Sequence, residues 1–154
     1  METQKVLVPY NFTKIDQRAL DFVVRTYGGR TDSAVTLLHI YVPMPNIETD
    51  STTVMGRLSS TMHYLAAELK EKEKDLGKAE QYLVEKGFSD QQVNHLFVPR
   101  SKQIADEIID IAKRDRYQVV VVSFRPHRIT RAFAQSVHSK IIAALQNIVV
   151  CIVT

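Results

Sequence analysis

The sequence predicts an α/β fold in which one five-stranded parallel sheet carries helices on both faces, a doubly wound, Rossmann-like arrangement. Five short apolar runs rich in β-branched residues are spread along the 154 residues, and a helical pattern fills each of the four gaps. Apolar runs without polar alternation are typical of strands covered on both faces. Strict alternation of strands and helices requires crossover connections, so the strands are parallel. This length suits a single domain, which we place at residues 1–154.

The strands are predicted where branched apolar residues dominate. The fourth is the clearest, since four valines follow one another from Val119 to Val122. The third is the weakest of the five. The predicted ranges are, in chain order, 5–9, 34–42, 93–98, 118–124 and 148–153.

The first two helices have recognisable ends. Thr13 is a suitable N-cap for the first, and Gly28 with Gly29 ends it. The second is the longest: apolar residues recur at three- and four-residue spacing from Leu58 to Leu83, and Gly87 stops it. Its charged stretch, 68–75, is interpreted as solvated surface.

The third and fourth helices are shorter. We expect Ser101 to cap the third, with Ile104 and Ile108 on its buried stripe, and the fourth to carry apolar residues at 133, 137, 141, 144 and 145. The long polar connection 41–53 is either a lid or a mobile link. His39, inside an apolar strand, is predicted to be a packed, hydrogen-bonded histidine.

The composition limits the cellular location and the kinds of partner that we expect for this chain. No apolar run approaches the roughly 20 residues that span a bilayer, and the polar N-terminus does not resemble a signal peptide. Cys151 is the only cysteine, which excludes an internal disulfide and favours a reducing, cytoplasmic location. The net charge of +3 is too small to indicate nucleic acid. We therefore expect neither membrane nor nucleic acid as a partner.

A ligand site is predicted at the carboxyl ends of the first and fourth strands, the usual neighbours of the switch in winding direction. Residues 98–140 hold nine Lys/Arg against four Asp/Glu, whereas residues 44–90 hold six against nine. An anionic ligand would therefore lie near the C-terminal half. The alternative, that the arginines form a solvated loop or a partner surface, is favoured. The candidate nucleotide- or anion-binding residues are Asn11, Phe12, Thr13, Ile40, Ser123, Arg125, His127, Arg128, Ser136, Val137 and Ser139, with Arg131 in the same loop.

The same segments resemble the universal stress protein family along almost the whole chain. Residues 6–9, 11–13 and 19–20 resemble its opening, and 37–40 its second strand. Residues 119–123, 136–139 and 148–153 resemble its fourth strand, the start of its last helix and its closing strand. The resemblance implies the UspA-like fold, of the adenine nucleotide alpha hydrolase-like type, and a role in stress response. It also places Ile40 where the family meets adenine.

The chain departs from the ATP-binding members of that family. Their motif is glycine, two residues, glycine, nine residues, then glycine followed by serine or threonine, so that amides close around the phosphates. The matching positions here are Ser123, Pro126 and Gln135, over a segment one residue shorter, and no glycine follows Gly87. The usual aspartate after the first strand is Asn11. The resemblance therefore implies a degenerate ATP-binding motif and no required cofactor, with ATP or AMP as an open but disfavoured ligand.

Catalytic motifs are not found, so we expect no enzyme. The sequence lacks a Gly-x-Ser-x-Gly elbow, a Walker lysine and a dinucleotide glycine fingerprint. An ATP hydrolase would require a metal-binding carboxylate near the cleft, and the sequence does not indicate one there. A response-regulator receiver would need an acidic pair after the first strand, where the chain has Asn11. No metal-ligand spacing is found among the histidines.

The closing strand predicts a homodimer. It carries no charge, and at a sheet edge it would expose unpaired backbone unless a partner strand or helices covered it. A two-fold copy would cover it, as in similar proteins. The leading hypothesis is a dimeric signalling module that acts through protein association; the alternative is a nucleotide- or anion-binding cleft rebuilt around Arg125, Arg128 and Ser136. The predicted interface consists of Ile148, Val149, Val150, Cys151, Ile152 and Val153.

Overall fold

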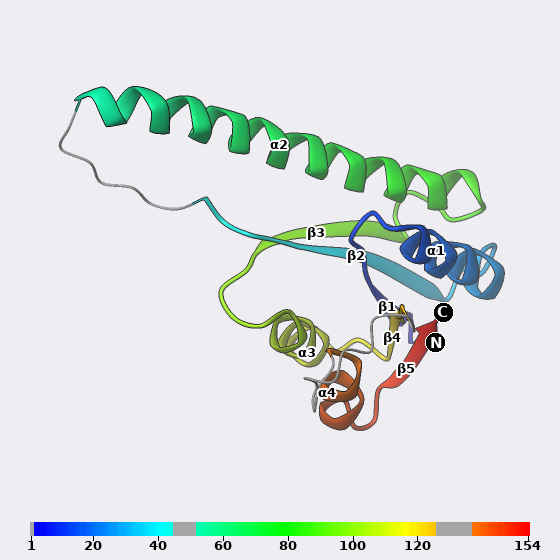
Figure 1. The fold of residues 1–154 in the computed structure, drawn as a ribbon. Coiled ribbons are helices and arrows are strands. Elements are labelled where there is room, and N and C mark those ends of the chain that lie inside the picture. The colour runs from blue at the N-terminus through cyan, green and yellow to red at the C-terminus, as the bar shows by residue number, and fades with distance from the viewer. Residues whose placement is uncertain (1, 45–51, 126–136) are drawn as a thin grey trace.

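The computed structural model describes residues 2–44, 52–125 and 137–154, and for 52–58 the backbone only. Within these ranges the chain alternates strand and helix from end to end (Figure 1). The strands are β1 Gln4–Pro9, β2 Ser33–Tyr41, β3 Val93–Pro99, β4 Val119–Ser123 and β5 Val149–Val153; the helices are α1 Lys14–Tyr27, α2 Thr52–Glu85, α3 Ile104–Arg114 and α4 Val137–Ala144.

The five strands form one parallel sheet in the order β3-β2-β1-β4-β5. This confirms the predicted α/β fold. β1 lies in the centre, paired with β2 on one side and β4 on the other. The winding direction therefore reverses between β1 and β4, the two strands that the sequence indicated. β3 and β5 are the edges of the sheet.

Each face of the sheet is covered by two helices (Figure 1). On one face α1 and the C-terminal half of α2 pack over β1, β2 and β4, with Leu20 and Leu83 fully buried. On the other face α3 and α4 pack together, with Ile108 and Ile141 against Leu7. This two-sided cover explains why the strand sequences are continuously apolar.

α1 begins and ends as its sequence predicts. Thr13 is its N-cap, and Thr13 and Asp16 form a capping box in which each side chain bonds the other's backbone N–H. Gly28 ends the helix, and its N–H donates to the carbonyl of Val24. A Cβ at position 28 would lie 2.5 Å from that carbonyl oxygen, so the close approach requires glycine.

The predicted cap of α3 is wrong. The N-cap position belongs to Gln103, whose side chain makes no capping bond, and the helix begins at Ile104. Ser101 instead donates its N–H and its hydroxyl to Glu107 Oε1, at 2.7 and 2.9 Å, and the N–H of Lys102 donates to the same oxygen at 3.1 Å. The Glu107 carboxylate thus binds the loop before the helix and delays the first turn.

α2 is longer than predicted, since it begins at Thr52 and not near Leu58. Its C-terminal half packs on the sheet through Leu76 and Leu83. Its N-terminal half runs past the end of the sheet (Figure 1), and Leu65 and Leu69 are only partly buried there. Among the described helices, none combines the length and the apolar character needed to cross a bilayer.

Candidate functional site

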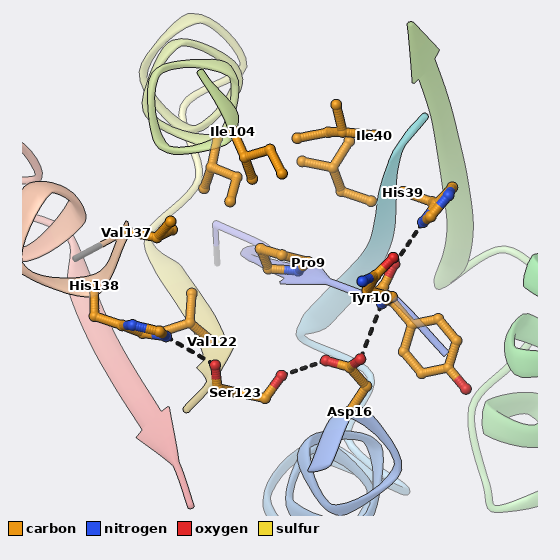
Figure 2. A pocket seen from close by; sticks show the side chains of 13 residues that line it. Pro9, Tyr10, Asp16, His39, Ile40, Ile104, Val122, Ser123, Val137 and His138 are labelled. Carbon is orange, nitrogen blue, oxygen red and sulfur yellow. Dashed lines mark hydrogen bonds between the residues drawn. The ribbon is translucent and has the colours of Figure 1, made fainter. Parts of the chain in front are cut away.

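A cleft of about 240 Å³ opens at the carboxyl ends of β1, β2 and β4, where the winding direction reverses (Figure 2). Helices α1, α3 and α4 supply its other walls. This is the position at which open α/β sheets bind ligands. The residues that line the cleft are Pro9, Tyr10, Asn11, Asp16, Leu38, His39, Ile40, Ile104, Ile108, Val122, Ser123, Val137 and His138.

The carboxylate of Asp16 lies between the ends of β1 and β4, and the side chain is only 4% exposed. Its Oδ2 accepts hydrogen bonds from the N–H of Asn11 and the N–H of Thr13, both at 3.0 Å, and from the Thr13 hydroxyl at 2.7 Å. Its Oδ1 accepts the hydroxyl of Ser123. Four donors from the turn before α1 and from β4 therefore converge on one carboxylate.

The turn between β1 and α1 is held in an unusual conformation. Phe12 has φ +59°, a left-handed value that a large aromatic residue rarely adopts. Its ring lies 5.1 Å from the ring of Tyr10 and 4.9 Å from that of His39, measured between centroids. The aromatic contacts and the two amides bound by Asp16 together fix this turn beside the cleft.

His39 is a packed histidine, as the sequence predicted. It is 3% exposed, and its Nδ1 donates to the backbone carbonyl of Tyr10 at 2.9 Å. Its ring stacks on Phe97, with centroids 5.6 Å apart. Burial lowers the pKa of His39 below 6.5, so the ring is neutral at pH 7 and adds no positive charge to the site.

His138 fixes the first turn of α4 to the end of β4. Its Nε2 donates to the carbonyl of Ser123 at 2.8 Å (Figure 2). Its ring meets that of Phe124 edge to face, with centroids 4.8 Å apart. Ser123 is therefore held through its hydroxyl by α1 and through its carbonyl by α4.

The remaining walls are aliphatic. The side chains of Ile40 and Ile104 face each other across the cleft in Figure 2, and Val122 and Val137 lie on the side of β4 and α4. Ile104 is 40% exposed, so it lines the cleft and does not extend the buried stripe of α3 as predicted. Apolar walls with a few fixed polar groups are typical of small-molecule sites.

The structure brings together some of the predicted site residues. Asn11, Ile40, Ser123 and Val137 line the cleft. Phe12 and Thr13 lie beside it, and Thr13 serves as the helix cap. Arg125 is exposed, and neither it nor Ser139 is among the lining residues. The other predicted residues, His127, Arg128 and Ser136, lie outside the described part of the chain, as does Arg131.

Sequence reasoning missed Asp16 and His138, the two residues that tie the helices to β4. The signal for Asp16 was present, because a threonine followed three residues later by an acidic residue is a capping-box pattern. The expected positive charge is not found on the described lining: it contains no lysine or arginine, and Asp16 is its one carboxylate. Among all described residues, no group of three His, Cys, Asp or Glu could hold a metal ion.

β5 forms one edge of the sheet, as the dimer prediction assumed. Val149 is 59% exposed and Ile152 is 44% exposed, although both belong to an uncharged apolar strand. Val150 packs into the core beneath α3 and α4, and Cys151 and Val153 pack against the core beneath α1. Burial raises the pKa of the Cys151 thiol, which makes it a weak nucleophile.

Comparison with known proteins places the fold in a family. The model of the universal stress protein family matches residues 2–152. The universal stress protein UspA from Lactobacillus plantarum aligns with a TM-score of 0.68 at 17% identity, over 100% of this chain and 99% of that one. The universal stress protein from Archaeoglobus fulgidus in complex with dAMP aligns with a TM-score of 0.66 at 17% identity, over 100% of both chains.

A further universal stress protein, solved in complex with cAMP, aligns with a TM-score of 0.63 at 17% identity, over 100% of this chain and 98% of that one. At these identities the likeness shows the fold alone. No curated protein sequence matches the chain significantly.

Proposed function

The chain belongs to the universal stress protein family, and we propose that it is a non-catalytic stress-response module that forms a homodimer and acts through protein association. The observation that carries this proposal is the uncharged edge strand β5, on which Val149 and Ile152 expose large apolar side chains. An apolar edge strand has unpaired backbone N–H and C=O groups that can form hydrogen bonds with a strand of another chain. A second copy related by a two-fold axis would pair β5 with itself and cover these side chains.

A mass measurement tests the dimer. Light scattering after gel filtration should give twice the chain mass of 17.6 kDa. Val149→Lys and Ile152→Lys place charges on the proposed interface and should each give the mass of one chain. Val42→Lys is the matched control, because Val42 is 72% exposed and follows β2, far from β5 in the sheet order. A wild-type mass of 17.6 kDa at all concentrations would refute the dimer.

Two features of the chain support the proposal that it does not bind ATP in the manner of the family. Ser123 stands where the resemblance expects the first glycine of the phosphate loop, and its hydroxyl is bonded to the buried carboxylate of Asp16. Pro126, at the second glycine position, has no amide hydrogen to offer a phosphate. The sequence that matches the phosphate loop therefore offers one amide donor fewer than in ATP-binding relatives, at the position of Pro126.

Nucleotide binding is the second candidate function, and the position of the cleft favours it. The walls of the cleft are apolar, it lies at the switch point, and two relatives with this fold are described in complex with dAMP and cAMP. Ile40 is available on β2 to contact a base. Arg125 and, further along the sequence, Arg128 are the candidate charge partners of a monophosphate bound here.

Thermal-shift titration with ATP, AMP, cyclic AMP and inorganic phosphate, with and without magnesium, separates the two candidates. We expect no shift with ATP at millimolar concentration. A ligand at about 100 times its dissociation constant stabilises the fold by about 2.7 kcal/mol, a rise of about 5–10 °C for this size. A shift of that size that disappears in Arg125→Ala and Arg128→Ala would establish the second candidate, a cleft rebuilt around arginine.

A further inference from the structure

Asp16 occupies the end of the cleft where a ligand oxyanion would find its donors. Two backbone N–H groups, of Asn11 and Thr13, and two hydroxyls, of Thr13 and Ser123, all donate to its carboxylate. These donors come from β4 and from the turn at the start of α1, so they are arranged around a point between the two strand ends. Amide and hydroxyl donors in such an array are the groups that bind phosphate oxygens.

Asp16 also supplies the one carboxylate among the described lining residues of the cleft. Asp16 is 4% exposed and lines the cleft, where the described lining residues include no lysine or arginine to balance it. The neutral ring of His39 does not balance it either. Repulsion between like charges grows as water is excluded, so a phosphate that approaches the donors bound by Asp16 would be repelled by its carboxylate.

We propose that Asp16 is the specificity-determining residue of the cleft: its carboxylate fills the oxyanion position from within the chain and keeps phosphate-bearing ligands out. The cleft as built admits only the uncharged part of a nucleotide-like molecule. Removing the carboxylate frees four donors and turns the same cleft into a site for phosphate monoesters. This inference rests on the proposed absence of family-type ATP binding and assigns that absence to one residue.

A purely structural role for Asp16 makes a different prediction. As the second half of the capping box, Asp16 stabilises α1 whether or not the cleft has a ligand. Its loss would then lower the melting temperature equally in buffer, with phosphate and with AMP. A site that excludes anions instead predicts a ligand-dependent gain in the variants, which a helix cap cannot produce.

Two substitutions at Asp16 and one control on the same helix provide the test. Asp16→Ala removes the carboxylate and leaves its four donors free, while Asp16→Asn keeps the shape and removes the charge. Asp21→Asn makes the same change in net charge elsewhere on α1, where Asp21 accepts the hydroxyl of Tyr82 at 2.7 Å. Each folded protein is titrated with inorganic phosphate, AMP and adenosine by calorimetry and by thermal shift.

We expect Asp16→Ala to bind AMP and inorganic phosphate at least about tenfold more tightly than wild type, a change equivalent to about 1.4 kcal/mol. Asp16→Asn should show a smaller gain, Asp21→Asn none, and adenosine should respond alike in all four proteins. The proposal is overturned if folded Asp16→Asn and Asp16→Ala gain nothing for either anion, or if wild type binds AMP as tightly as they do. The ATP titration of the wild type and the mass measurement test the proposed function independently, so its failure can be distinguished from the failure of this inference.

Discussion

Asp16 shows how one side chain can serve folding and selectivity at once. It closes the capping box of α1 and joins that helix to Ser123 at the end of β4. The cap is local in sequence, so Thr13 was predicted correctly from the residue type and the following apolar pattern. The bond to Ser123 spans 107 positions and depends on the sheet order, which no local pattern encodes. The capping role of Asp16 can therefore be predicted from the sequence, whereas its bond to Ser123 at the cleft cannot.

Glu107 plays the corresponding part at the start of α3, and it makes stability depend on pH. Hydrogen bonds from the N–H and hydroxyl of Ser101 and from the N–H of Lys102 hold the pKa of Glu107 below 4.5. A carboxyl group whose pKa is lower in the folded state stabilises the fold above its unfolded pKa. That stability is lost as the pH falls through the folded value.

We therefore predict that Glu107→Gln lowers the free energy of unfolding at pH 7, and that its difference from wild type shrinks as the pH falls below 4.5. Urea unfolding at pH 7, 5 and 3 measures this difference. Glu85→Gln, which removes an exposed carboxylate of α2, controls for the loss of a surface charge. A difference that stays constant from pH 7 to pH 3 would contradict the prediction.

At the scale of elements, the strands were predicted well because both faces of the sheet are buried. The helix ends were predicted less well because they depend on local hydrogen bonds. All five apolar runs are strands, because β-branched residues suit a sheet that helices cover on each side. The start of α3 was misplaced because Ser101, a good cap by residue type, is bound by Glu107. The start of α2 was misplaced because the apolar spacing that predicts the helix begins at Leu58, whereas the helix itself begins at Thr52 and its N-terminal half runs past the sheet (Figure 1).

Gly77 lies within the C-terminal half of α2, and we predict that Gly77→Ala stabilises the protein by about 0.5–1 kcal/mol. A Cβ at position 77 has no atom within 4 Å outside the local helix backbone, so alanine adds helix propensity without a clash. The expected rise in melting temperature is about 1–4 °C. Calorimetry measures it.

Gly28→Ala is the matched control for this substitution, because the Cβ at position 28 would lie 2.5 Å from the carbonyl oxygen of Val24. It should lower the melting temperature. A lower melting temperature for Gly77→Ala would contradict the prediction.

At the scale of the whole molecule, the order of the strands determines where the cleft lies and which strands form the edges of the sheet. The sequence predicts a switch between the first and fourth strands by analogy with other doubly wound sheets, and the order β3-β2-β1-β4-β5 confirms it. The same order puts β5 at an edge and exposes one row of its backbone groups. The position of the cleft and the edge position of β5 therefore both follow from the placement of β4 between β1 and β5.

Hydrogen exchange at individual amides of β5 tests whether two copies of the chain pair through this strand. The N–H of Val149 donates to the carbonyl of Gln118, and the carbonyl of Val153 accepts from Phe124, so the odd-numbered residues of β5 face β4. Because strand residues alternate, the N–H groups of Val150 and Ile152 point away from the sheet. In a monomer these two amides face solvent, whereas in a dimer paired through β5 they are bonded to the partner strand.

We predict that the amides of Val150 and Ile152 exchange slowly in the wild type and at least about tenfold faster in Val149→Lys, since the charge separates the two edge strands. The amides of Cys151 and Val153 should stay protected in both proteins because they face β4, which makes them internal controls. Amide-resolved exchange measured by NMR, at concentrations where wild type is a dimer by mass, reads both pairs at once. Equal, fast exchange of Val150 and Ile152 in a wild-type dimer would place the contact between copies elsewhere, and β5 would then be an edge that the fold leaves open for a different protein.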